Sequence, residues 1–241
     1  MTDPLYRTDP YRLSCTARVV SASAEAGIVV ADSVFYPAGG GQPGDSGWLD
    51  WDGGRIALTD SRKADTGVAL IPEPGAVLPP MGAEVALELD WVRRHLHMRV
   101  HTALHLLSVV MPYPVTGGQI GAGTGRLDFD LPEAPEDKAA IEAALNALIA
   151  RDLPVTEDWI TDAELAANPG LVKTMSVAPP TGQGRVRLIR IGQGGDQVDL
   201  QPCGGTHVRA TAEIGPVTLG KIEKKGRQNR RVKLHLAGFG A

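Results

Sequence analysis

The chain has 241 residues, enough for one large domain or two small ones, and its 43% apolar content can supply a hydrophobic core. Two cysteines are too few for a disulfide framework, and the chain has neither a run of roughly 18 apolar residues nor a signal-peptide pattern at its start. We therefore expect a reducing, cytoplasmic setting and no membrane insertion. The formal net charge of −4, taken alone, argues against nucleic-acid binding.

Residues 1–90 carry the pattern of a small β-barrel. Leu13, Cys15, Ala17 and Val19 alternate with polar residues, which predicts a half-buried strand with Cys15 in the core. Further short strand patterns follow at even spacing, at residues 28–34, 48–51, 56–58, 68–71 and 85–89. Such spacing with frequent turn signals is typical of a barrel.

A glycine-rich segment, residues 37–47 (PAGGGQPGDSG), lies between two of these strands. Consecutive glycines permit positive φ or a close approach of backbone to a ligand, while Gln42 and Asp45 offer polar contacts. The segment is not a P-loop, because the lysine and Ser/Thr of that motif are missing. On these residues alone a plain hairpin connection is the favoured interpretation.

Strand character continues to Leu89, so we place the domain boundary near Asp90 and predict two domains, 1–90 and 91–241. The second domain begins near a helix with two histidines four residues apart, His101 and His105, which share one helical face. An adjacent apolar stripe, formed by Val100, Leu104, Leu107 and Met111, faces the core, and Pro112 ends the run.

A second pair, Cys203 and His207, is also four residues apart, but Gly204-Gly205 between them predicts a turn that folds both side chains inward. Together, the two pairs form a set of three histidines and one cysteine, a donor set that suits zinc. The alternative is a group of buried, hydrogen-bonded histidines beside an inert thiol. His97 extends the histidine spacing, but zinc takes four protein ligands at most, so we interpret His97 as a group behind the ligands or facing RNA.

The remaining pattern predicts helices packed on an antiparallel sheet, which makes the second domain α+β. We expect a turn-rich loop at 116–121, a strand at 126–131 and an amphipathic helix at 135–150. A capping box at Thr161 opens a short helix that Asn168-Pro169-Gly170 ends. Paired strands at 185–191 and 196–200 deliver Cys203, and a hairpin at 217–222 and 232–236 ends the domain.

Basic residues are concentrated in the second domain, since residues 1–90 carry 6 basic and 13 acidic residues and residues 91–241 carry 18 and 15. A local basic patch is the footprint of a phosphate backbone, and a solvated face is the alternative. The predicted RNA contacts are Arg93, Arg94 and Arg99 beside the metal helix, and Lys224, Lys225, Arg227, Arg230 and Arg231 at the hairpin tip.

Four motifs together resemble the freestanding alanyl-tRNA editing proteins, AlaX, which are related to the editing domain of alanyl-tRNA synthetase. They are HTALHLL from His101, residues 116–130 (TGGQIG…RLDFD), CGGTHVRATAEIG from Cys203 and KGRQNRRV from Lys225. Residues 32–47 are similar to the glycine-rich motif of the medium-length class. The resemblance implies a barrel like those of translation factors, and a substrate loop at Gly39, Gly40, Gly41, Gln42, Asp45 and Gly47 that packs on the editing site.

What the resemblance implies is hydrolysis of the ester between a wrong amino acid and tRNA(Ala). We expect Ser-tRNA(Ala) to be the substrate and Gly-tRNA(Ala) to be a poor one, because glycine lacks the serine hydroxyl. Zinc either takes a water or the substrate into its coordination or only shapes the pocket. Candidate substrate contacts are Gln119, Asp199, Thr102 and Thr206. We expect no DNA and no membrane partner, and the sequence leaves monomer and homodimer open. Two other classes also remain open: a zinc-stabilised RNA-binding module without catalysis, and a zinc hydrolase of small-molecule esters.

Overall fold

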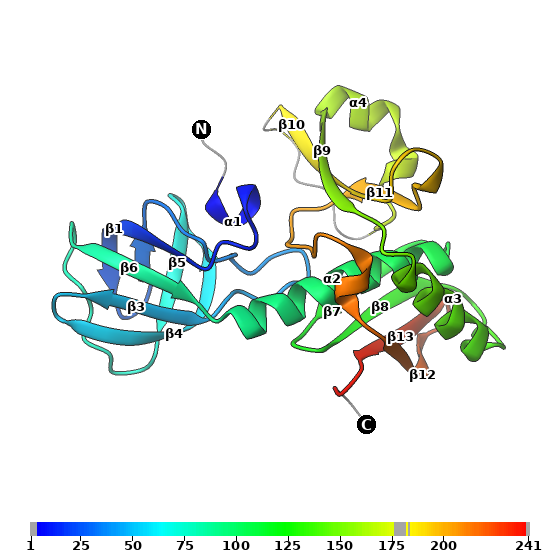
Figure 1. Ribbon diagram of the computed structural model, residues 1–241, viewed down its shortest axis with the longest axis horizontal. Coiled ribbons are helices and arrows are strands. Elements are labelled where there is room, and N and C mark those ends of the chain that lie inside the picture. The colour runs from blue at the N-terminus through cyan, green and yellow to red at the C-terminus, as the bar shows by residue number, and fades with distance from the viewer. Residues whose placement is uncertain (1–3, 176–181, 183, 240–241) are drawn as a thin grey trace. The chain divides into compact units, whose positions relative to one another are not determined.

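The computed structural model describes residues 4–175, 182 and 184–239, and the chain divides into two compact units between His95 and Leu96 (Figure 1). The division lies inside helix α2 (Trp91–Val110), because the first residues of this helix belong to the same unit as the barrel strands. The predicted boundary at 90/91 stays a prediction. None of the helices in the described part of the chain has the length and apolar character that crossing a membrane requires.

The first unit is a closed six-stranded antiparallel barrel in the order β1-β2-β5-β4-β3-β6 (Figure 1). Cys15, Ala17 and Val19 point into its core, as the alternation predicted. Closure between β1 and β6 leaves no open edge for pairing with another chain. The elements are α1 (Leu5–Thr8), β1 (Ser14–Ser23), β2 (Gly27–Val30), β3 (Gly47–Trp51), β4 (Gly54–Lys63), β5 (Val68–Pro72) and β6 (Glu84–Leu89).

The strand predicted at 28–34 was too long, because β2 ends at Val30. Val34 and Phe35 are fully buried all the same, so their apolar side chains serve the core from irregular backbone. Periodicity reports burial, and a buried loop residue carries the same signal as a strand residue.

The second unit contains a four-stranded antiparallel sheet in the order β12-β13-β8-β7. Its strands are β7 (Val115–Ile120), β8 (Thr124–Asp130), β12 (Val217–Gly226) and β13 (Asn229–Leu236). Helix α2 packs on one face, since a Cβ at Gly125 would lie 2.5 Å from Val100 Cγ1. Helix α3 (Lys138–Ala150) covers the free edge of β12, where Glu142 Oε2 accepts from Leu219 N (2.7 Å).

A three-stranded antiparallel sheet, β11-β10-β9, completes this unit with strands β9 (Val155–Thr161), β10 (Arg185–Ile191) and β11 (Asp199–Pro202). Strand β9 was not predicted. The capping box is confirmed: Thr161 Oγ1 accepts from Glu164 N, and Glu164 Oε2 accepts from Thr161 N, at the start of helix α4 (Asp162–Ala167). Three short 3₁₀ turns, Pro169–Leu171, Gly194–Asp196 and Thr211–Ile214, link the elements.

Two element predictions were wrong in this unit. Residues 116–120 are part of strand β7 rather than a loop, because the adjacent glycines remain paired with β8 across a bulge. The strand predicted at 196–200 starts only at Asp199, after the 3₁₀ turn at Gly194–Asp196. Glycine suggested a loop at 116–121, but backbone pairing with β8 decided the structure there.

Candidate metal centre and active site

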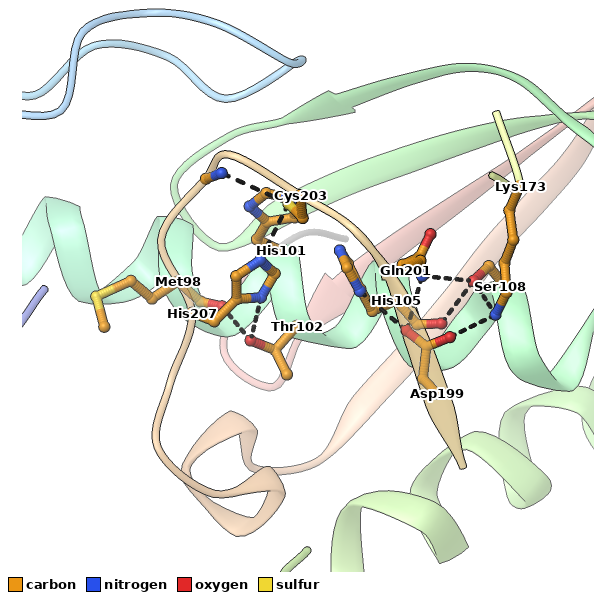
Figure 2. Close-up of polar contacts among 11 residues, drawn as sticks. Met98, His101, Thr102, His105, Ser108, Lys173, Asp199, Gln201, Cys203 and His207 are labelled. Carbon is orange, nitrogen blue, oxygen red and sulfur yellow. Dashed lines mark hydrogen bonds and ion pairs between the residues drawn. The ribbon is translucent and has the colours of Figure 1, made fainter. Parts of the chain in front are cut away.

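The four predicted metal ligands converge in the second unit (Figure 2). His101 and His105 lie one turn apart on helix α2, while Cys203 and His207 lie on the turn that follows β11. Their ligand atoms all fall within 4.8 Å of one another. Three of the four residues are buried, and Cys203 is partly exposed.

The distances among these atoms fit a zinc ion. Cys203 Sγ lies 3.4 Å from His101 Nε2 and 3.3 Å from His207 Nε2. In a tetrahedral zinc site, bond lengths near 2.3 Å to sulfur and 2.0–2.1 Å to nitrogen separate these two ligand atoms by about 3.5 Å. Cys203 therefore already has the spacing of a zinc tetrahedron to His101 and His207, and His105 completes a group within 4.8 Å.

The tautomer of His207 follows from hydrogen-bond accounting at Thr102. Thr102 Oγ1 lies 3.0 Å from Met98 O, and a carbonyl only accepts, so the single hydroxyl hydrogen is donated there. Thr102 Oγ1 must then accept from Val208 N (3.3 Å) and from His207 Nδ1 (3.1 Å). Nδ1 of His207 consequently carries the hydrogen, and Nε2 turns its lone pair toward Cys203, as a metal ligand must.

His105 is oriented by a buried carboxylate. Its Nδ1 donates to Asp199 Oδ2 (3.0 Å), which leaves Nε2 facing the cluster. Asp199 is held in turn by Lys173 Nζ (2.5 Å) and by Gln201 Nε2 (2.7 Å), and Figure 2 shows this chain of contacts running from His105 to Lys173 beside Ser108. The pattern is the carboxylate–histidine pair that accompanies metal sites.

The electrostatics of the cluster favour a deprotonated sulfur. Burial alone would raise the pKa of the Cys203 thiol, but the imidazoles of His101 and His207 outweigh burial and hold that pKa well below its usual value. Burial alone would lower the pKa of His105, whereas the hydrogen bond to Asp199 and the neighbouring Cys203 raise it to about 9. Burial and the nearby His101 lower the pKa of His207 well below its usual value, so His207 is neutral at pH 7.

Arg187 is a site residue that the sequence analysis missed. From strand β10, its Nη1 donates to the carbonyls of Cys203 (3.0 Å) and Gly205 (2.8 Å), and its Nη2 donates to Glu157 (2.5 Å). One guanidinium thus holds the turn that carries two ligands. The available signal was an arginine between Val186 and Leu188 in a run that is otherwise buried.

Two predicted substrate contacts have other tasks in the structure. The hydroxyl of Thr102 uses its donor and both acceptors on Met98, Val208 and His207, so it has no capacity left for a substrate. The carboxylate of Asp199 is buried against His105, Lys173 and Gln201. We therefore reassign both residues from substrate binding to holding the ligand histidines.

Gln119, the third predicted substrate contact, does not point toward the cluster of His101, His105, Cys203 and His207. It is exposed on β7 and pairs with Arg126, which donates to its Oε1 (3.2 Å). Gly125, next to Arg126, faces helix α2, so the alternation of the strand turns Arg126 and Gln119 to the opposite face of the sheet. Thr206 is buried directly before His207 in the chain.

The predicted RNA-contacting arginines are mostly engaged inside the protein. Arg94 is fully buried, where it pairs with Asp45 and donates to the carbonyls of Val34 (2.7 Å) and Pro10 (2.9 Å). Its assignment as an RNA contact was wrong, because no surface of the side chain is accessible. Arg93 donates to Gly44 O (3.4 Å).

In the second unit, Arg230 is likewise buried and holds the hairpin tip through the carbonyls of Gly226 and Asn229, so it too is withdrawn from the RNA contacts. Arg99 donates to Ile214 O (3.0 and 2.8 Å), and Arg231 pairs with Asp128 (2.8 Å). Lys225 is exposed but pairs with Glu223 (2.5 Å). The exposed Lys224 and Arg227 remain at the tip.

The glycine-rich segment belongs to the barrel unit. Gly39 and Gln42 form a small bridge, and the buried Asp45 accepts from Tyr36 N (2.6 Å) and pairs with Arg94. Burial raises the pKa of Asp45 above its ordinary value, and Arg94 opposes that shift. Gly40 and Gly41 have positive φ (58° and 82°), which explains two of the consecutive glycines. The predicted role of the loop in shaping an editing site stays a prediction.

Residues 186–233, which include the turn that carries Cys203 and His207, match the family described as the threonyl and alanyl tRNA synthetase second additional domain. The chain belongs to the AlaX-M family of alanyl-tRNA editing proteins. It is 33% identical to the protein of Methanosarcina barkeri over 241 residues (96% of this chain and 98% of that protein) and 32% identical to that of Methanosarcina mazei over 247 residues (98% and 97%).

The chain is also similar to a much longer enzyme. It is 34% identical over 232 residues to the alanine–tRNA ligase of Pyrobaculum arsenaticum, covering 92% of this chain and 25% of the ligase. The chain thus spans about a quarter of the length of the ligases that it matches.

Proposed function

We propose that this chain is a trans-editing deacylase that hydrolyses Ser-tRNA(Ala), with zinc held by His101, His105, Cys203 and His207. The observation that carries the proposal is the donor set itself. Two of its imidazoles are already turned by Thr102 and Asp199 so that their Nε2 atoms face Cys203. Family membership supports the reaction, because the Methanosarcina relatives are named alanyl-tRNA editing proteins.

Zinc bound at this site would supply a Lewis acid for the ester carbonyl or a fixed wall of the pocket. The chain's own residues provide the rigidity that either role requires. Asp199 and Thr102 hold two imidazoles, and Arg187 holds the carbonyls on both sides of Gly204. Because aminoacyl esters are labile, accurate positioning of the ester contributes most of the catalysis in this proposal.

Discrimination against alanine requires a group that hydrogen-bonds the serine hydroxyl, since serine is the larger amino acid and cannot be selected by exclusion. Among the predicted residues, Thr206 is the proposed partner because it is buried directly beside His207 in the chain. Gly-tRNA(Ala) lacks this hydroxyl and should be a poorer substrate than Ser-tRNA(Ala). Selectivity of a hydroxyl-reading site reaches roughly 10⁴ or more.

The proposed partner is the acceptor end of tRNA(Ala) in a cytoplasmic setting, with Lys224 and Arg227 at the hairpin tip as phosphate contacts. A second candidate function, a zinc-stabilised RNA-binding module, is favoured by one observation: four protein ligands fill a tetrahedral zinc site, as in structural sites.

One assay separates these functions. The purified protein is incubated with Ser-tRNA(Ala), Gly-tRNA(Ala) and Ala-tRNA(Ala), with and without chelator, and ester loss is followed. We expect rapid loss of serine, slower loss of glycine and retention of alanine, with activity abolished by chelation. Binding of tRNA without release of any amino acid would favour the RNA-binding module instead.

A further inference from the structure

Gly204 lies in the metal-binding turn at a position where the fold does not require glycine. Its φ is not among the positive values that glycine alone adopts readily. A Cβ built at Gly204 would meet no atom of the described residues within 4 Å, apart from its chain neighbours. By contrast, a Cβ at Gly125 would lie 2.5 Å from Val100. Alanine at 204 would therefore cause neither backbone strain nor a clash with the part of the chain that the structure describes.

The free space at Gly204 adjoins the accessible side of the cluster. Cys203, the residue before it, is the one ligand of the four that is not buried. Figure 2 shows Cys203 on the turn that passes over the helix carrying His101. A molecule that approaches the ligand atoms from the side of Cys203 must pass close to the backbone of residue 204.

The turn at this point cannot easily move aside. Arg187 donates to the carbonyls of residues 203 and 205, so one buried guanidinium holds the peptide groups 203–204 and 205–206. The amide of Gly205 also points at Cys203 Sγ (3.5 Å). A methyl group added to Gly204 would consequently occupy a fixed position, and an incoming ligand would have to give way.

We infer that the open space at Gly204 admits the aminoacyl ester at the 3′ end of the tRNA, and that the missing side chain at 204 controls access to the metal ligands. This inference rests on the proposed deacylase function. It assigns to Gly204 a positioning role: without a side chain at 204, the ester and its ribose can lie close to the backbone. A side chain of any size would lift that group away from the cluster.

The test compares Gly204→Ala and Gly204→Val with the unmodified protein. We expect unchanged zinc content and an equal or higher melting temperature for Gly204→Ala, because alanine restricts the unfolded chain more than glycine. The value of kcat/KM for Ser-tRNA(Ala) should fall on the order of 10- to 100-fold for alanine, and further for valine, since small displacements of the reacting group cost that much. Hydrolysis of 3′-O-seryl adenosine should fall by the same factor, because the obstruction lies at the aminoacyl end.

A binding measurement gives a readout that does not depend on turnover. Titration with 3′-seryl-amino-3′-deoxyadenosine, the amide that is not hydrolysed, should show a Kd raised about tenfold or more in Gly204→Ala. The matched control is Gly195→Ala in the same unit, where a Cβ also meets nothing within 4 Å and φ is not positive. This control should keep full activity and full affinity for the amide.

Each outcome decides the inference. Wild-type activity in Gly204→Ala would overturn it while leaving the deacylase proposal intact. Loss of zinc or a lower melting temperature in Gly204→Ala would overturn it as well, because glycine would then serve the fold. An unmodified protein that neither deacylates Ser-tRNA(Ala) nor binds the amide would overturn the proposed function and this inference together.

Discussion

At the scale of single residues, Thr102 shows how a hydroxyl outside the candidate metal ligands can set the tautomer of one of them. Its one hydrogen goes to Met98 O, so His207 must donate through Nδ1 and present Nε2. Groups that orient metal ligands from behind typically account for roughly 10- to 100-fold in metal affinity.

We predict that Thr102→Val weakens zinc binding by roughly 10- to 100-fold, because valine keeps the shape and removes the acceptor of His207. Thr102→Ser should retain the affinity of the unmodified protein. Competition with a calibrated chelator measures both constants. Equal affinities for the valine and serine variants would show that His207 is oriented by something else.

Asp128 is a residue outside the cluster whose ionisation should contribute to stability. Its carboxylate receives Arg126 Nη1 (2.6 Å) and Arg231 Nε (2.8 Å). Burial alone would raise the pKa of Asp128, but the contacts with Arg231 and Arg126 outweigh burial and lower it. A lowered folded-state pKa means that the ionised form contributes stability above the unfolded-state pKa, which is about 3.9, and that this contribution is lost as the pH falls through the folded-state value.

We predict that Asp128→Asn lowers the free energy of unfolding at pH 7 by about 1–3 kcal/mol, the range for a hydrogen bond to a charged group. The difference from the unmodified protein should shrink as the pH falls below about 4, because the carboxylate of the unfolded chain is protonated first and that of the folded protein only at a lower pH. Urea unfolding at several pH values measures this difference in the free energy of unfolding. Asp130→Asn is the control, because Asp130 lies on the same strand and its carboxylate has no ion-pair partner among the described residues. A difference that stays constant from pH 7 to pH 3 would contradict the ion-pair explanation.

At the scale of elements, the β12–β13 hairpin shows why basic residues cannot be counted as one patch. Arg230 and Arg231 lie side by side in the sequence, yet Arg230 is buried and braces the tip while Arg231 pairs with Asp128. Strand alternation separates neighbouring residues onto opposite faces. Lys224 and Arg227 remain exposed at the tip and carry the prediction for RNA.

We predict that the double variant Lys224→Glu, Arg227→Glu raises KM for Ser-tRNA(Ala) and flattens its dependence on salt, by roughly one unit of log–log slope for each phosphate that the protein no longer neutralises. Hydrolysis of 3′-O-seryl adenosine and zinc content should not change, since the short substrate has no phosphate backbone. Arg151→Glu, a charge reversal at an exposed arginine paired with Asp196, is the control. An unchanged salt slope would move the RNA surface away from the hairpin tip.

At the scale of the whole molecule, the two units have separate cores. The barrel core is one cluster of buried residues between Tyr6 and Leu89, whereas all four candidate metal ligands lie in the second unit. A ligand that binds only the folded form stabilises it by about 2.7 kcal/mol at a hundred times its Kd. Zinc should therefore stabilise one unit and leave the other unchanged.

We predict two thermal transitions in the zinc-loaded protein, of which only one moves to lower temperature when a chelator is added. His101→Ala and Cys203→Ala, which each remove a ligand, should shift the same transition without chelator. Differential scanning calorimetry measures both effects, and elemental analysis should give about one zinc per chain before chelation. A chelator that shifts both transitions, or neither, would contradict this assignment of zinc to the second unit.

By itself, the sequence determined the features that depend on neighbours within one or two turns. The i, i+4 spacing placed His101 and His105 on one face of a helix, the alternation from Leu13 marked a barrel strand, and the capping box opened α4 at Thr161. These patterns arise from backbone geometry, which repeats with a fixed period. The family motifs additionally predicted that the helix with His101 and His105 and the turn with Cys203 form one site.

Only the tertiary structure decided what each polar side chain does, because its partner can lie anywhere in the chain. Thr102 meets His207 across 105 positions, and Arg94 meets Asp45 across 49. From the sequence we therefore predicted that Thr102 contacts the substrate and that Arg94 contacts RNA. In the structure, Thr102 is hydrogen-bonded to His207, and Arg94 is buried in the barrel unit. Arg187 was missed for the same reason. The sequence shows that it lies between Val186 and Leu188, but it does not show that its guanidinium donates to carbonyls of the turn after β11.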